Sequence, residues 1–202
     1  MSIWHDSMMH AARGRCCSPT SCRSEGEEPA LRTRPTPDDP EAWNAYLAEG
    51  NAKQARKRVA VDLIIRDQVG RVLVVNPTYK PDWDLPGGMV EANEPPEKAA
   101  RREVREELGL QLTPGRLLVI EWVPPHGPWD DQLAFILDGG ELSVEQSAGL
   151  RPHDDELAEL AMLAPGDARP LLRPRLHARF DAALAALADG RARYLSDGRP
   201  IF

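Results

Sequence analysis

The segment that is most informative about the fold and the functional site is GMVEANEPPEKAARREVREELGL, residues 88–110. Its polar, proline-started second half predicts a helix over residues 95–108, which a glycine ends. At about 100° per residue, Glu103, Glu106 and Glu107 fall within a sector of roughly 100° on that helix. Three carboxylates are therefore gathered on one side, where they repel one another unless a cation lies between them.

An apolar stripe lies next to these carboxylates on the predicted helix. Ala100, Val104 and Leu108 are spaced by four residues, so they share one face that can pack on the core. The carboxylates therefore lie at the edge of the buried face. Grouped oxygen ligands of this kind suit Mg²⁺ or Mn²⁺, which prefer carboxylates, water and substrate phosphates.

A second interpretation of the same segment is a solvated surface helix held by internal salt bridges. Arg102 can reach Glu106, and Arg101 can reach Glu97, because residues four apart are neighbours on a helix. Runs of charged residues are usual on solvent-facing helices. Helix geometry alone therefore leaves a metal site and a solvated face both open.

Two glycines precede the predicted helix. Gly87 and Gly88 follow Pro86, and without side chains they let backbone carbonyls and amides approach a metal or a phosphate closely. A plain strand-to-helix turn also favours glycine. The pair is compatible with both interpretations.

Together these residues resemble the Nudix box, which reads Gly, five residues, Glu, seven residues, then Arg-Glu-aliphatic-any-Glu-Glu-any-Gly-aliphatic. Each specified position is matched, by Gly88, Glu94, Arg102, Glu103, Val104, Glu106, Glu107, Gly109 and Leu110. At about 5–7% per fixed residue, a chance match at one start is on the order of one in a billion. The resemblance implies an α/β/α sandwich with a mixed β-sheet.

The resemblance also implies an activity and a set of site residues. Most Nudix proteins hydrolyse nucleoside diphosphates linked to another group, with Mg²⁺ or Mn²⁺. By matching positions, the expected metal ligands are Glu103, Glu106, Glu107 and a backbone carbonyl at Gly87 or Gly88. Glu103, Arg102 and Glu106 are the expected catalytic residues, with Arg102 orienting the glutamates and Glu94 supporting them. The general base is expected to be Glu103 or an acid outside the box, for which the candidates are Asp154, Asp155, Glu156 and Glu159.

Residues expected to bind the substrate are Trp83, Gly88 and Pro125. Pro125 lies fifteen residues past the box, a place that resembles a marker of the subfamily that cleaves ADP-ribose. Trp83, and Trp122 or Trp129, could stack on a nucleobase, and packing in the core or in loops is the alternative for these tryptophans.

The rest of the chain is organised around this box. A β-hairpin is expected from apolar, β-branched runs at 58–66 and 71–76, followed by three strands and an amphipathic helix, at 117–123, 132–137, 157–163 and 176–187. The expected domains are a disordered N-terminal tail (1–38), an accessory helix (39–55), the Nudix domain (56–190) and a C-terminal extension (191–202).

Composition limits the other function classes. The net charge of −7 and pI near 5.3 argue against a partner that is a nucleic acid or a membrane surface. We find no apolar run of about 18 residues and no signal-peptide core, so a cytoplasmic protein is expected. Cys16, Cys17 and Cys22 form no disulfide framework. The expected partner is a small-molecule nucleotide, and a homodimer is possible on the resemblance.

Two alternatives within the same fold compete with a hydrolase. A non-catalytic regulator that binds a nucleoside diphosphate would need a DNA-binding appendage, for which the sequence has no pattern. Isopentenyl diphosphate isomerisation relies on a catalytic cysteine, whereas all three cysteines lie in the N-terminal tail. The intact set of glutamates favours turnover.

Overall fold

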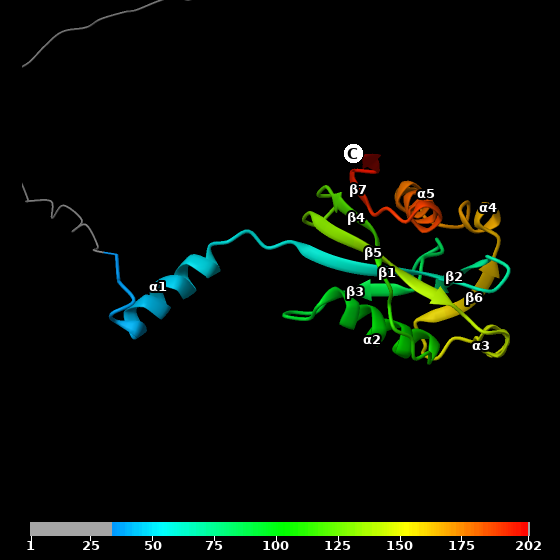
Figure 1. Ribbon diagram of the computed structural model, residues 1–202, viewed down its shortest axis with the longest axis horizontal. Coiled ribbons are helices and arrows are strands. Elements are labelled where there is room, and N and C mark those ends of the chain that lie inside the picture. Colours follow the sequence, from blue (N-terminus) through cyan, green and yellow to red (C-terminus); the bar gives the residue numbers. More distant parts are fainter. Residues whose placement is uncertain (1–33, 202) are drawn as a thin grey trace, which may run out of the picture. The chain divides into compact units, whose positions relative to one another are not determined.

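The computed structural model describes residues 34–201 (Figure 1). Most of the expected disordered tail (1–38) and the three cysteines lie outside the described residues. The described residues fall into two units, one ending at Gln54 and the other beginning at Ala55. In the first, α1 (Pro40–Ala52) begins at Asp39, whose carboxylate accepts a hydrogen bond from Ala42 N at 3.1 Å.

The second unit is built on one eight-stranded mixed sheet. Its strands are β1 (Arg58–Arg66), β2 (Val72–Pro77), β3 (Gly87–Met89), β4 (Leu117–Val123), β5 (Gln132–Glu141), β6 (Leu157–Leu163), β7 (Arg193–Ser196) and β8 (Arg199–Pro200). They are ordered β6-β2-β1-β5-β4-β7-β8, with β3 paired to β1 off this path. β1 runs parallel to β5 and antiparallel to β2 and β3.

The central position of β1 follows from its sequence, RVAVDLIIR. Apolar residues stand at successive positions, so both faces of the strand can be buried. Val61, Leu63 and Ile65 belong to the core on one side of the sheet, and Ile64 belongs to the core on the other.

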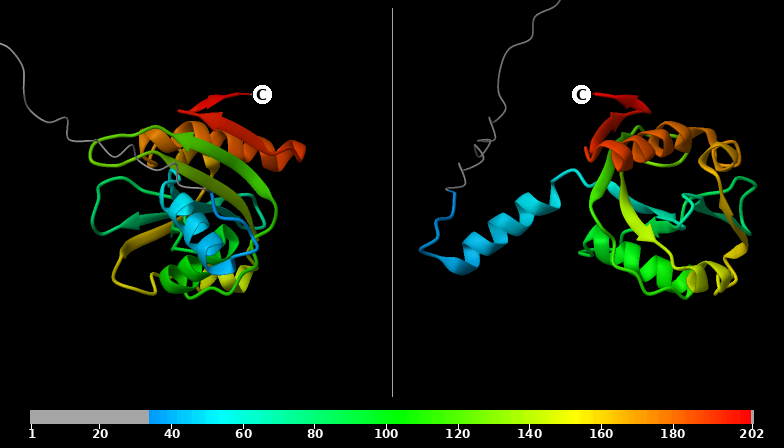
Figure 2. Two further views of the ribbon diagram at one scale, coloured as in Figure 1. Left: turned by 90° about the vertical axis from the view of Figure 1, so that its left-hand side faces the viewer. Right: turned by 45° about the vertical axis from the view of Figure 1, so that its right-hand side comes forward.

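Helices cover both faces of the sheet. Helix α2 (Pro96–Leu108) packs on one face, and α4 (Pro165–Ala168) and α5 (Pro174–Asp189) lie on the other (Figures 1 and 2). The short α3 (Val144–Ala148) follows β5. Each face has its own hydrophobic core, one centred on Val104 of α2 and one on Phe180 of α5. The three layers confirm the predicted α/β/α sandwich with a mixed sheet.

The expected hairpin of β1 and β2 is correct only at its tip. The two strands pair at Arg66 and Val72. Nearer the start of β1, the residues from Ala60 to Asp62 pair with β3 instead. The turn brings the strands together, but β2 then diverges and pairs along its length with β6.

The expected C-terminal extension (191–202) is part of the sheet instead. β7 pairs in parallel with β4, and β8 returns antiparallel to β7. Leu195 of β7 is 1% exposed and belongs to the core beneath α5. The strand is only four residues long, which is too short for a periodic apolar pattern to mark it.

Candidate active site

The box helix α2 is held to the sheet by its apolar stripe. Ala100, Val104 and Leu108 are buried against strands β1 and β3. The helix ends at Gly109, whose left-handed φ of 64° favours glycine. This packing orients the face of α2 that carries the glutamates toward β3, the strand with the two glycines.

Strand β3 brings bare backbone against α2. Gly87 and Gly88 pair with Asp62 and Val61 of β1. A Cβ at Gly88 would stand 2.5 Å from the carboxyl carbon of Glu103. At Gly87, φ is 142° and a Cβ would stand 2.2 Å from the carbonyl oxygen of Val61. Gly87 therefore requires glycine, and the missing side chain at Gly88 makes room for the Glu103 carboxylate.

Arg102 organises the side chains around it. Its Nε and Nη2 donate to the two carboxylate oxygens of Glu94, at 3.1 and 3.0 Å, and Nη2 also donates to the Met89 carbonyl at 3.1 Å. Nη1 donates to Glu103 at 2.9 Å and to Glu106 at 3.2 Å. These charge-assisted bonds fix one oxygen of each of these two glutamates.

Glu107 is the most buried of the three glutamates, with 8% exposure. Its Oε2 accepts a hydrogen bond from Gly87 N at 3.2 Å, and no ion pair involves it in the described part of the chain. Burial raises the pKa of Glu107 to about 8, with smaller contributions from the negative charges of Glu103 and Asp154. Glu107 is thus a buried acidic group with no positively charged partner among residues 34–201.

The other two glutamates differ in exposure. The side chain of Glu103 is 18% exposed, and that of Glu106 is 47% exposed. Burial raises the pKa of Glu103, and the charges of Glu106 and Glu156 add to this effect, whereas Arg102 opposes it. The negative charges that act on Glu103 thus come from Glu106 of α2 and from Glu156, which lies in the acidic segment 154–156 outside the box.

His153 anchors that acidic segment to the end of α2. Its backbone N donates to the Glu107 carbonyl at 2.8 Å, and its Nδ1 lies 3.2 Å from the Glu106 carbonyl. Just beyond it, Asp154 Oδ1 accepts from Glu156 N at 3.0 Å. Of the four acids considered outside the box, Asp154 and Glu156 are the two whose charges reach the glutamates of α2.

The carboxylates of Glu103, Glu106 and Glu107 do not all point in the same direction. Among residues 34–201, no three Asp, Glu, His or Cys side chains converge on a position that could hold an ion. Arg102 draws Glu103 and Glu106 toward itself, and Glu107 turns to the backbone of Gly87. The donor chemistry nevertheless fits a divalent cation, because all donors are oxygens and Glu107 lacks a positive partner.

Comparison with known proteins agrees with this geometry. Residues 56–186 match the NUDIX domain family. The chain belongs to the NUDIX family. Its box, residues 88–110, lies inside the matched range, and Gly88 and three glutamates of that box, together with the preceding Gly87, form the site described above.

Several curated proteins are similar to this NUDIX protein over part of its length. Diphosphoinositol polyphosphate phosphohydrolase 2 of Rattus norvegicus is 46% identical over 82 residues, which are 40% of this chain and 44% of the relative. ADP-ribose pyrophosphatase of Methanocaldococcus jannaschii is 38% identical over 97 residues, 45% of this chain and 57% of the relative. Phosphatase NudJ of Escherichia coli is 32% identical over 91 residues, 44% of this chain and 56% of the relative. The chain thus spans about half the length of these relatives.

Solved structures share the fold. A MutT NUDIX hydrolase from Burkholderia pseudomallei is 29% identical, with a TM-score of 0.52 over 64% of this chain and 98% of that one. The structure of a UDP-X diphosphatase is 19% identical, with a TM-score of 0.58 over 78% of this chain and 87% of that one.

The residues expected to bind substrate in this NUDIX protein lie in different settings. Trp83 is half-buried, packs against the core beneath α5 and donates its backbone N–H to the Leu171 carbonyl. Pro125 is exposed on the β4–β5 loop. Trp122 donates its Nε1–H to Asp131 at 2.8 Å, which fixes its ring.

Trp129, in the same loop, is 54% exposed and is linked to the box strand through Arg58. The Arg58 guanidinium lies 4.4 Å from the centre of the Trp129 ring, and its Nη2 lies 4.0 Å from Met89 Sδ. Arg58 Nη1 is buried and has no hydrogen-bond partner. An exposed aromatic ring and an unused donor therefore stand beside the box.

Sequence reasoning missed a buried charged cluster on the opposite face of the sheet. Arg179 of α5 donates to Glu121 of β4 at 2.6 Å and lies 3.5 Å from Asp62 of β1. Burial and, to a smaller extent, the negative charge of Asp84 raise the pKa of Asp62 to about 6, and the positive charge of Arg179 opposes them. A lone acid inside an apolar strand was the available signal, because a buried charge needs a partner.

Proposed function

We propose that this NUDIX protein hydrolyses a phosphoric anhydride bond in a nucleoside diphosphate linked to another moiety. The observation that carries the proposal is the buried Glu107, whose carboxylate has no positive partner and lies beside the glycine strand and Glu103. An uncompensated buried carboxylate is unfavourable. Its presence is explained if a cation and a phosphate complete the site.

The cofactor in this proposal is Mg²⁺ or Mn²⁺. Glu103, Glu106 and Glu107 would hold it, with the backbone at Gly87 beside them. When bound, such an ion neutralises phosphate charge and lowers the pKa of a bound water. Arg102 orients Glu103 and Glu106 for this role, and Glu94 fixes Arg102 by two hydrogen bonds.

A carboxylate of the protein would take the proton from the attacking water. Glu103 is our first choice, because Arg102 binds only one of its oxygens and its partly buried carboxylate has a raised pKa. Glu156 is the alternative from outside the box, since its charge acts on Glu103 and His153 ties its segment to α2.

The substrate would enter beside Met89 and Trp129. The exposed ring of Trp129 can stack on a base, and the Arg58 guanidinium, 4.4 Å from the centre of that ring, holds the ring beside Met89. The names of the similar proteins include a diphosphoinositol polyphosphate phosphohydrolase and an ADP-ribose pyrophosphatase. ADP-ribose, nucleotide sugars and nucleoside triphosphates are therefore the first compounds to test.

The test is a substrate panel with Mg²⁺ or Mn²⁺, analysed by chromatography of the products and by phosphate release with and without added phosphatase. We expect cleavage of an anhydride bond, no turnover with EDTA, and a loss of at least about a hundredfold for Glu103→Gln. Glu97→Gln is the matched control, because Glu97 is exposed on the same helix. Nucleotide binding without any product would overturn the hydrolase and support a non-catalytic regulator on the same fold.

A further inference from the structure

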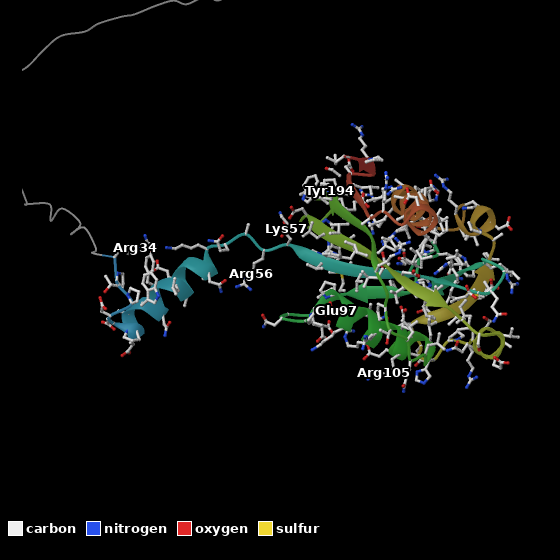
Figure 3. The ribbon with its side chains drawn as sticks, viewed as in Figure 1. Arg34, Arg56, Lys57, Glu97, Arg105 and Tyr194 are labelled. Carbon is white, nitrogen blue, oxygen red and sulfur yellow. The ribbon has the colours of Figure 1, made fainter. Side chains whose placement is uncertain are left out.

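The outer side of α2 carries a basic stripe that the proposed reaction does not use. Lys98, Arg101 and Arg105 are exposed, and at 100° per residue they fall within about 60° of one another. The glutamates of the box occupy a different sector of the helix. Figure 3 shows Arg105 on the side of α2 that is turned away from the sheet.

These cations are poorly compensated. The salt bridge from Arg101 to Glu97 that the sequence allows is not among the ion pairs of residues 34–201, and Lys98 forms none there either. Arg105 has only a long contact, 3.9 Å from Glu106 Oε1. Like charges three and four residues apart destabilise a helix by about 0.2–0.5 kcal/mol per pair. The stripe contains two such pairs, Lys98–Arg101 and Arg101–Arg105, so it destabilises the helix by about 0.4–1 kcal/mol.

A groove runs along the stripe. Its volume is about 680 Å³, and it lies between the basic side of α2 and the segment 110–113 that follows the helix. The lining residues are Lys98, Arg101, Arg102, Arg105, Leu110, Gln111, Leu112 and Thr113. The volume is in the range of small-molecule sites. Four cations and two neutral polar side chains face one small space.

We propose that this groove binds a small molecule bearing several phosphoryl groups, at a site separate from the box carboxylates. Arginine guanidinium groups match phosphate oxygens in pairs, and the groove is lined by Arg101 and Arg105, which form no ion pair shorter than 3.9 Å among residues 34–201. The positive stripe from Lys98 to Arg105 extends only about 10 Å along the helix axis. Because the chain as a whole carries a charge of −7, a short polyphosphate fits this surface better than a long nucleic acid.

The groove and the box share one residue. Arg102 lines the groove, yet its guanidinium donates to Glu94, Glu103 and Glu106. An anion in the groove would therefore lie beside the side chain that positions two box glutamates. Occupancy of the groove provides a route by which a phosphorylated metabolite alters turnover without entering the active site.

Calorimetric titration of the full chain with inorganic tripolyphosphate tests the site. The titration is done in EDTA and at constant ionic strength, because without metal the box glutamates repel a polyphosphate. We expect one bound tripolyphosphate. Arg101→Ala/Arg105→Ala should weaken binding at least about tenfold and lower its salt dependence. Both arginines are exposed, so the melting temperature should stay within a few degrees of wild type.

Arg175→Ala/Arg199→Ala is the matched control, since it removes the same charge from exposed positions outside the groove. It should bind tripolyphosphate like wild type. Equal weakening by both double variants, wild-type binding by the groove variant, or no heat at about 1 mM ligand would overturn the proposal. ATP in a parallel titration identifies the source of the phosphates: tighter binding than tripolyphosphate indicates a nucleotide. Because metal is absent, none of these outcomes depends on the hydrolase activity.

Discussion

Replacing Glu107 by glutamine tests two properties of the buried carboxylate separately. The first is the folding stability lost by burying it, and the second is its role in binding metal. In the metal-free protein, burial raises the pKa of Glu107 from 4.5 to about 8. The folded state therefore keeps the proton over a pH range in which the unfolded chain releases it. Wild type should lose stability as the pH rises from about 4.5 to about 8, and Glu107→Gln should not show this loss.

The magnitude follows from the two pKa values. Each pH unit above the unfolded value lowers the free energy of unfolding by about 1.4 kcal/mol, until the folded state also ionises. At pH 7 the loss is on the order of 3 kcal/mol. For a domain of this size, that corresponds to a difference in melting temperature of roughly 5–10 °C between wild type and the variant.

Thermal or urea unfolding in EDTA at pH 5 and pH 8 measures this effect. The stability of Glu107→Gln relative to wild type should be greater at pH 8 than at pH 5. Because burying the amide costs the same at both pH values, that cost cancels in this comparison. Mg²⁺ should then stabilise wild type more than the variant. A pH-independent difference would refute the burial argument. An equal Mg²⁺ response would refute the metal role of Glu107.

Three further predictions concern packing, one at the site and two on the opposite face of the sheet. Gly88→Ala should reduce turnover strongly in steady-state assays, because the added methyl would stand 2.5 Å from the Glu103 carboxyl carbon and displace that carboxylate; the melting temperature should change little, since the end of a flexible side chain can move aside. Arg179→Ala should destabilise the protein by about 3–5 kcal/mol in urea unfolding, because it leaves Glu121 charged and buried; unchanged stability would mean that Glu121 finds another partner. Leu195→Ala should cost about 2–5 kcal/mol, whereas a true C-terminal extension would tolerate it without a change in midpoint.

The bounds of single helices and strands could be predicted because the residues that indicate them are neighbours in the sequence. The box helix was expected over 95–108 and spans Pro96–Leu108, ended by Gly109 as its glycine signal indicates. The strand at 58–66 is observed with the expected bounds, since its β-branched run is continuous. The strand expected at 132–137 extends to Glu141, because pairing with β1 continues past a bulge near Ile64.

The arrangement in space could not be predicted in the same way. Nothing in the run from Arg58 to Arg66 shows that its neighbours are β5 and β3. The orientation of Glu107 toward Gly87 N depends on that pairing, as does the link from Trp129 through Arg58 to Met89. The box motif identifies the glutamates, but only the three-dimensional structure shows which of them is buried.

The pairing of β1 with β5 also has a consequence for how the protein folds. It joins Arg58 to Gln132, and the parallel β4–β7 pair joins Val119 to Arg193. Loops of this length must close before such contacts form, so strands with distant partners assemble slowly. Helix α2 therefore has no complete sheet to dock on until residues near 140 have been synthesised, and β4 gains its parallel neighbour only when residues 193–196 have followed.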